Sequence, residues 1–92
     1  MWKVYWSKSV DKSLDKLPSF IVEKFRAWVV AVESDGMLSV RKLKGFHDEP
    51  LKGQRTGQRS VRLNRAYRFI YIEKEDGKIH IAEVIEVNKH EY

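Results

Sequence analysis

Four polar side chains of this sequence could together transfer protons and stabilise charge on a phosphate group. His90 carries an imidazole that titrates near neutral pH, and Tyr92 carries a phenol that can stack on a base. Glu49 offers a carboxylate that can accept a proton, and Arg68 offers a guanidinium suited to phosphoryl oxygens. Cleavage of RNA by its own 2′-hydroxyl needs these groups: a base, a cation for the phosphoryl charge, and an acid for the departing 5′-oxygen. The set is a candidate site for this metal-independent reaction, although each residue alone could be structural or solvated.

The positive charge of the chain is concentrated in one segment. The net charge is +5, yet residues 40–68 hold nine Lys or Arg against two Asp or Glu, which makes +7. Arginine binds phosphate through a fork of N–H groups, so this segment favours a partner that carries phosphates. The alternative is a solvated basic face that only aids solubility. The candidate RNA-binding residues are Lys52, Arg55, Arg59, Arg62 and Arg65.

The N-terminal part predicts a strand followed by a pair of helices. Residues 2–6 (WKVYW) alternate in the manner of a short strand. Val10, Leu14 and Leu17 recur at helical spacing, and Pro18 ends this helix and opens a second one. The second helix has one apolar face and stops at Gly36. Residues 37–57 are punctuated by Gly and Pro and are predicted to form a loop.

After residue 57 the pattern changes to period two and predicts three strands. Residues 59–64, 66–74 and 79–87 are rich in β-branched and aromatic residues, and Asp76-Gly77 marks a hairpin turn. We therefore predict an α+β fold in one domain, residues 1–92, with an N-terminal strand and a helical hairpin packed on an antiparallel sheet (β-α-α-β-β-β). The helices cover one face, so the other face and the loop of residues 37–57 are left for a partner. If the tail continues the last strand, His90 and Tyr92 share a face.

Several classes of site and location are not indicated. The chain has no cysteine, and its three histidines, at positions 47, 80 and 90, lack metal-ligand spacing, so we expect neither a metal nor another cofactor. His47 and His80 are expected to be structural. The longest apolar run, Ala27 to Val32, is far too short for a bilayer span, and the first ten residues do not form a signal peptide. We expect a soluble protein without membrane contact, cytoplasmic in a bacterial host.

The sequence resembles the RelE/HigB/YoeB superfamily of toxins from type II toxin–antitoxin systems. The resemblance rests on "EPLKGQRTGQRSVRLNRAYRFIY" (Glu49 to Tyr71), a hydrophobic strand after it, and the ending "NKHEY". The N-terminal strand and helical hairpin fit the same family, so the likeness extends over nearly the whole chain. It implies a compact, microbial-RNase-like fold that cleaves mRNA in the ribosomal decoding site, with mRNA and ribosomal RNA contacts. It also implies a cognate antitoxin protein as the inhibiting partner.

The resemblance also implies roles for single residues. Glu49 matches the carboxylate proposed as general base in the YoeB branch, and Arg68 matches the arginine that stabilises the transition state. His90 and Tyr92 resemble the closing pair of that branch, a general acid and a positioning or stacking group, although Glu91 separates them here. The RelE branch relies on Lys and Arg instead, so Lys52, Arg59 and Arg62 could share the stabilisation of charge.

Two other functions stay open from the sequence. A ParE-like toxin of the same fold would inhibit a DNA topoisomerase by binding and would cut no RNA. A basic module that only binds RNA or the ribosome is the third possibility. The ParE-like branch typically lacks a complete acid/base set, so the presence of Glu49, Arg68, His90 and Tyr92 in one chain favours cleavage over that alternative. The basic segment also favours an acidic, partly disordered antitoxin segment as the partner that covers the site.

Overall fold

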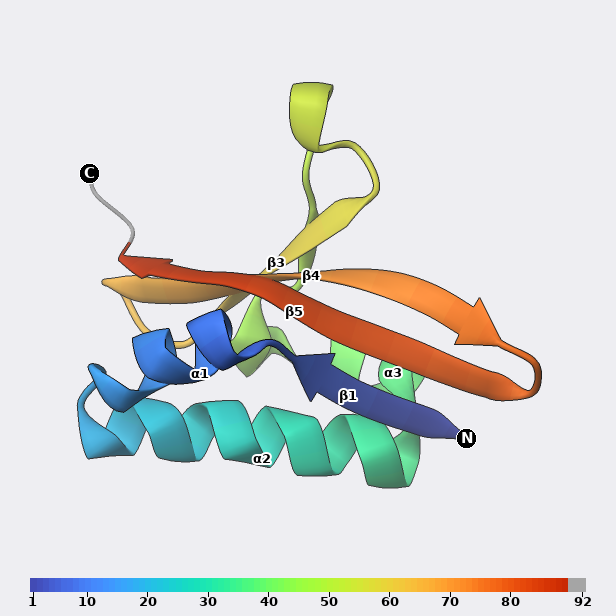
Figure 1. The fold of residues 1–92 in the computed structure, drawn as a ribbon, viewed down its shortest axis with the longest axis horizontal. Coiled ribbons are helices and arrows are strands. Elements are labelled where there is room, and N and C mark those ends of the chain that lie inside the picture. Colours follow the sequence, from blue (N-terminus) through green and yellow to red (C-terminus); the bar gives the residue numbers. More distant parts are fainter. Residues whose placement is uncertain (90–92) are drawn as a thin grey trace.

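A computed structural model describes residues 1–89 of the 92-residue chain as a five-stranded sheet with helices on one face (Figure 1). In chain order the helices and strands are β1 (Trp2–Trp6), α1 (Lys8–Asp15), α2 (Ser19–Asp35), α3 (Met37–Arg41), η1 (Lys44–Phe46), β2 (Glu49–Pro50), η2 (Gly53–Arg55), β3 (Gln58–Arg62), β4 (Tyr67–Asp76) and β5 (Ile79–Lys89), where η marks a short 3₁₀ helix. None of the helices within residues 1–89 combines the length and the apolar character that crossing a bilayer demands. The predicted α+β fold class is confirmed.

α2 begins and ends where the sequence predicts, whereas α1 ends at Asp15, before Leu17 and Pro18. The Ser7 hydroxyl accepts a hydrogen bond from the backbone N–H of Val10 at 3.2 Å and so caps α1. Pro18 directly precedes α2, where its missing N–H costs no hydrogen bond. Gly36 ends α2 with a φ of 87°, a conformation that side chains with a Cβ rarely adopt.

The prediction of a loop over residues 37–57 is wrong in part. Gly36 turns the chain directly into α3, whose Met37 and Val40 are each 1% exposed in the core. Two short 3₁₀ helices and the two-residue strand β2 follow before β3 begins. Elements of two to five residues are too short to show an apolar period, which is why composition alone favoured a loop.

The sheet has the strand order β1-β5-β4-β3-β2. The pairs β2–β3, β3–β4 and β4–β5 are antiparallel, and the hairpin of β4 and β5 turns at Gly77, whose φ is 62°. The N-terminal strand β1 pairs with β5 in the parallel direction, so this edge differs from the rest of the predicted antiparallel sheet. The pairing joins the two ends of the described chain in one sheet.

Aromatic packing between α2 and β4 fixes the helices on their face of the sheet. The ring of Trp28 lies edge-on to Phe69, with centroids 4.6 Å apart, and Phe25 meets the same ring at 5.2 Å. Each of these rings is at most 1% exposed. Because side chains alternate across a strand, the burial of Phe69 in β4 and Val61 in β3 sends their polar neighbours to the opposite face.

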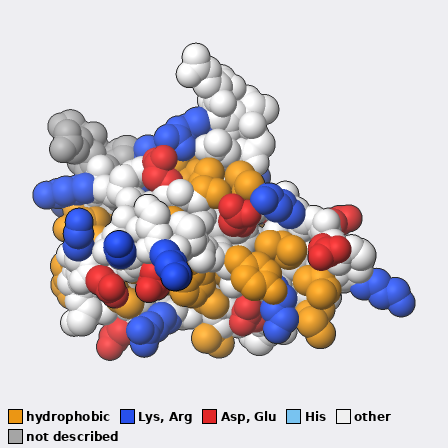
Figure 2. All heavy atoms as spheres, in the orientation of Figure 1, with side chains coloured by type: hydrophobic (Ala, Val, Ile, Leu, Met, Phe, Trp, Pro, Cys, Tyr) orange, Lys and Arg blue, Asp and Glu red, His pale blue; other side chains and the backbone are white. Residues whose placement is uncertain are grey.

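One side of the molecule carries charges of both signs. Figure 2 shows the side carrying α1, β1 and β5, where acidic and basic side chains are interspersed. The segment of β2 and η2 projects away from the helices on the far side of the sheet (Figure 1). The polar face of β3 and β4 next to this segment holds the candidate site.

Candidate functional site

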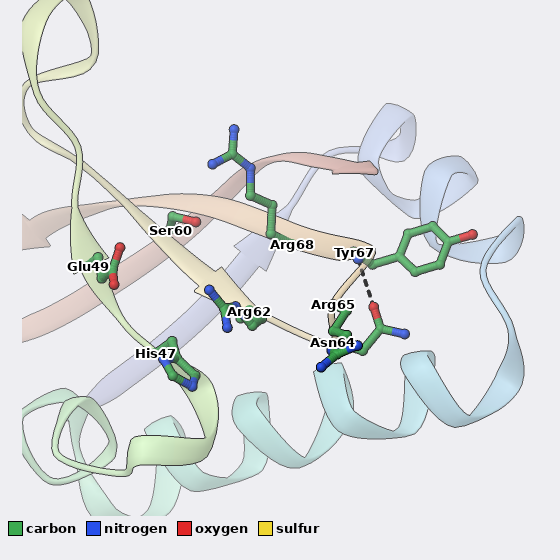
Figure 3. Close-up of a pocket in the computed structure, with 8 residues that line it drawn as sticks. All are labelled: His47, Glu49, Ser60, Arg62, Asn64, Arg65, Tyr67 and Arg68. Carbon is green, nitrogen blue, oxygen red and sulfur yellow. Dashed lines mark hydrogen bonds between the residues drawn. The ribbon is translucent and has the colours of Figure 1, made fainter. Parts of the chain in front are cut away.

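A polar pocket of about 200 Å³ opens on the helix-free face of the sheet (Figure 3). Four of the residues predicted for the site line it together: Glu49, Arg62, Arg65 and Arg68. The remaining lining residues are His47, Ser60, Asn64 and Tyr67. One carboxylate and three guanidinium groups therefore surround a space that would admit a phosphodiester group.

Strand register explains why these residues meet. Glu49 of β2 is paired with Ser60 of β3, and Arg62 of β3 is paired with Arg68 of β4. Directly paired residues on neighbouring strands project to the same face of a sheet. Since Val61 points into the core, Ser60 and Arg62 must point out on the pocket side. The period-two pattern of the sequence is therefore sufficient to predict that Ser60 and Arg62 share the outer face.

The turn between β3 and β4 is closed by the Asn64 side chain and by backbone hydrogen bonds from Leu63 and Asn64 to the carbonyl of Tyr67. The amide oxygen of Asn64 accepts hydrogen bonds from the backbone N–H groups of Ala66 and Tyr67, both at 2.8 Å. Leu63, which is 1% exposed, anchors the start of the turn in the core. This local closure, an Asx-type turn, holds Arg65 at the rim of the pocket.

Arg68 is oriented by a chain of polar contacts from β5. Its Nε donates to the amide oxygen of Asn88 at 3.2 Å, and the amide nitrogen of Asn88 donates to Glu86 at 2.5 Å. Glu86 also forms an ion pair with Arg55 at 3.0 Å. The contact to Asn88 uses only the Nε–H of Arg68, which leaves the two terminal nitrogens of the guanidinium for an anion.

Two of the predicted RNA-binding residues lie apart from the pocket, and a third is engaged elsewhere. Lys52 is exposed at the start of η2, and Arg55 within η2 is paired with Glu86. Arg59 shares the face of Val61, because the two residues are two positions apart in β3, and it binds Asp48 instead. His90 and Tyr92 lie outside the described residues, so their roles stay predictions. The described part of β5 ends at Lys89, which is paired with Tyr67.

Asp48 is the carboxylate that fixes the segment carrying Glu49, and it is not among the site residues predicted from the sequence. Its side chain is 1% exposed and accepts a hydrogen bond from Arg59 Nε and one from the Tyr71 hydroxyl, both at 2.5 Å. Arg41 Nε lies 3.8 Å away, and this arginine also contacts Tyr71 and Glu73. A buried carboxylate without such partners would be strongly unfavourable. Only contacts between distant parts of the chain distinguish Asp48 from its exposed neighbour, so the sequence held no signal for it.

Burial, followed by the hydrogen bond to Asp48, raises the pKa of Tyr71 well above its ordinary value of 10.0. Below about pH 10 both folded and unfolded protein keep this phenol protonated, so the stabilisation is complete. As the pH rises further, only the unfolded state loses the proton, and the free energy of unfolding falls by up to about 1.4 kcal/mol per pH unit. We expect urea unfolding, from about pH 8 to about pH 12, to show a steeper loss for the wild type than for Tyr71→Phe. If the free energy of unfolding fell equally with pH in the two proteins, the raised pKa of Tyr71 would be contradicted.

No group of three or more His, Asp or Glu that could hold a metal ion occurs within residues 1–89. The pocket instead offers one carboxylate, one imidazole and three guanidinium groups. Guanidinium groups repel metal cations and attract phosphate, so the donor set favours an anionic ligand.

Comparison with known proteins finds a likeness in structure and none in sequence alone. No family model and no curated protein matches the chain. Among solved structures, a YoeB/ParE toxin from Agrobacterium tumefaciens is similar with a TM-score of 0.74 and 24% identity, over 97% of this chain and 99% of that one. YafQ from Escherichia coli is similar with a TM-score of 0.70 and 12% identity, over 98% and 94%. The toxin–antitoxin complex RelBE2 from Mycobacterium tuberculosis gives 0.58 and 25%, over 96% of each chain.

These three structures test the resemblance of the sequence to the RelE/HigB/YoeB superfamily. The structural likeness extends over nearly the full length of both chains in each case, at identities too low to carry residue roles across. The resemblance is confirmed at the level of architecture: this chain has the fold of the RelE/YoeB superfamily of toxins.

Proposed function

We propose that this protein is the toxin of a type II toxin–antitoxin system and cleaves mRNA on the ribosome. The observation that carries the proposal is the pocket, where Glu49 meets Arg62, Arg65 and Arg68 on the face that no helix covers. A carboxylate among guanidinium groups suits a substrate that presents both a hydroxyl proton and a phosphate. The shared fold with YoeB, YafQ and RelE toxins supports the same class.

The proposed reaction is metal-independent transfer of the phosphoryl group to the neighbouring 2′-oxygen. Glu49 accepts the 2′-hydroxyl proton while that oxygen attacks phosphorus, and the bond from phosphorus to the 5′-oxygen breaks. Arg68 donates hydrogen bonds to the phosphoryl oxygens as their charge grows. The resemblance assigns the proton for the leaving oxygen to His90 and a stacking role to Tyr92, and these two assignments remain predictions. The products are a 2′,3′-cyclic phosphate and a 5′-hydroxyl end.

The proposed inhibitor is a cognate antitoxin with an acidic segment. The neighbour RelBE2 is a toxin–antitoxin complex, which supports a protein partner of this class. Within residues 1–89, no acidic group forms an ion pair with Arg62, Arg65 or Arg68, so carboxylates of a partner could bind there. An antitoxin bound in this way would block the pocket and suppress cleavage.

The test is induced expression in growing bacteria together with mapping of mRNA ends. We expect growth arrest, with new 5′-hydroxyl ends within translated reading frames and none in untranslated RNA. The neighbour from Agrobacterium tumefaciens carries both the YoeB and the ParE name, so topoisomerase inhibition is the second candidate. Arrest without new RNA ends, accompanied by loss of DNA supercoiling activity, would favour that alternative and reject the proposed cleavage.

The pocket arginines predict a strong dependence of RNA binding on salt. Each phosphate contact to single-stranded RNA contributes about −0.7 to the slope of log affinity against log salt concentration. We expect Arg62→Ala to weaken binding and to reduce this slope by about 0.7. Binding should be measured with a single-stranded RNA that carries a 2′-deoxy sugar at the cleavage site, so that no cleavage occurs.

Arg26→Ala is the matched control for Arg62→Ala. Arg26 is an exposed arginine of α2, and the net charge changes equally in the two variants. It lines a different pocket, between α1 and α2, away from the candidate site. If the slope of log affinity against log salt concentration fell equally in both variants, RNA binding would depend on total charge and not on a specific contact with the pocket.

A further inference from the structure

His47, which the sequence predicts to be structural, lines the same pocket as Glu49. Its side chain is exposed, and Figure 3 shows it beside Arg62, with Glu49 further along the same segment. Imidazole is the side chain that both donates and accepts protons near neutral pH. The pocket therefore contains a second group able to transfer protons, within the described part of the chain.

The backbone holds His47 in an unusual conformation. His47 has a φ of 45° and a ψ of 51°, the left-handed region, and no other non-glycine residue within residues 1–89 has a positive φ. Such a conformation persists in a protein only when the surrounding structure determines it. Two anchors do so here: the backbone N–H of His47 donates to the carbonyl of Lys44 at 3.1 Å, and the next residue is the clamped Asp48.

Asp48 explains why its two neighbours both face the pocket. The Asp48 carboxylate is directed inward to Arg59 and Tyr71. Residues 47 and 49 lie on either side of Asp48, and their side chains are on the outer face, where they line the pocket. The Cα atoms of positions 47 and 49 are at most about 7 Å apart. Because both side chains also line the same pocket, the imidazole of His47 and the carboxylate of Glu49 can reach one phosphodiester step. The charged groups around them are Arg62 on β3, Arg65 in the turn and Arg68 on β4.

We propose that His47, in place of His90, is the catalytic residue of this pocket that donates the proton that the departing 5′-oxygen of the RNA requires. This inference rests on the proposed ribonuclease function. Glu49 takes the proton of the 2′-hydroxyl, the 2′-oxygen bonds to phosphorus, the bond to the 5′-oxygen breaks, and protonated His47 gives its proton to that oxygen. Glu49 then releases its proton to water and the imidazole takes up a proton from water, which restores both groups. The proton donor then belongs to the rigid segment of residues 47–49.

The experiment compares His47→Asn with the wild type on two mRNA substrates bound to ribosomes. Asparagine tolerates the left-handed conformation of position 47, so the variant keeps the backbone and loses the proton donor. One substrate has the natural 5′-oxygen, and the other has sulfur at that position, a leaving group that needs no proton. We expect His47→Asn to lose about 10²- to 10⁴-fold in rate on the oxygen substrate. On the sulfur substrate the variant should approach the rate of the wild type.

Three controls decide between the possible results. His80→Asn removes a histidine that stacks on Trp2, with ring centroids 5.0 Å apart, and should leave both rates unchanged. Glu49→Gln should stay slow on both substrates, because sulfur does not replace the base. His90→Asn tests the competing donor, and if sulfur restores this variant and not His47→Asn, the proposal for His47 is wrong.

The remaining outcomes separate the role of His47 from the proposed ribonuclease function. Wild-type rates for His47→Asn on the oxygen substrate would overturn the role of His47 and leave the ribonuclease function standing. A loss in His47→Asn that sulfur does not restore would likewise overturn proton donation. If the wild-type protein itself cleaves neither substrate, the proposed function fails, and the role of His47 fails with it.

Discussion

Replacing Glu49 with glutamine is expected to slow mRNA cleavage by about 10²- to 10⁴-fold, the usual contribution of a general base. The amide has nearly the size of the carboxylate but cannot accept the 2′-hydroxyl proton. Glu49 is an exposed residue of β2, and no basic group within residues 1–89 forms an ion pair with it. We therefore expect the free energy of unfolding to change by less than about 0.5 kcal/mol. The measurement is the single-turnover cleavage rate on ribosomes that carry a defined mRNA.

Glu83→Gln gives the matched control for this change. Glu83 lies on β5 and pairs with Lys74 at 2.6 Å, outside the pocket, and the substitution alters the net charge by the same amount. Its cleavage rate should equal that of the wild type. If Glu49→Gln cleaved at the wild-type rate, the base would have to be another group, and the arginines and lysines of the RelE branch would be the next candidates.

The outline of the fold could be predicted because its elements leave strong local patterns. The burial of Ile21, Phe25, Trp28 and Val32 on one face of α2 follows the helical spacing of the sequence. The alternation of Val61 with Ser60 and Arg62 in β3 follows period two. The short elements between Gly36 and Gln58 have no such pattern, because their conformation is set by contacts with the sheet and the core.

The same alternation could have corrected one part of the site. Arg59 and Val61 are two positions apart in one strand, so they share a face, and Arg59 is turned away from Arg62. Counting cations along the segment had grouped Arg59 with the RNA-binding residues. The structure shows that Arg59 is engaged with a carboxylate inside the protein.

The grouping of His47, Asp48 and Glu49 could not be read from the sequence. Three consecutive polar residues in a predicted loop differ in role only through their partners. The partners of Asp48 are Arg41, Arg59 and Tyr71, which lie on α3, β3 and β4. The sheet register that joins these elements had to be known before Asp48 could be separated from its neighbours.

Asp48→Asn is expected to be the most destabilising substitution near the site. Removing one partner of a buried ion pair typically costs about 3–5 kcal/mol, because the opposite charge stays buried and uncompensated. Arg41 and Arg59 keep 26% and 23% of their side-chain exposure, so water can screen part of the charge, and we expect about 3 kcal/mol. For a domain of this size each 1 kcal/mol shifts the melting temperature by about 4–8 °C, so thermal and urea unfolding should both detect the change.

A control and a double variant separate the buried pair from general loss of charge. Glu73→Gln removes the carboxylate that also contacts Arg41, but its side chain is 40% exposed, and an exposed pair is worth about 1 kcal/mol or less. Combining Asp48→Asn with Arg59→Met removes the buried carboxylate together with its nearest cation, and we expect this double variant to be more stable than Asp48→Asn alone. If Asp48→Asn instead unfolded like Glu73→Gln, Asp48 would not hold residues 47–49 in place. The rigid presentation of His47 and Glu49 to the pocket would then need another cause.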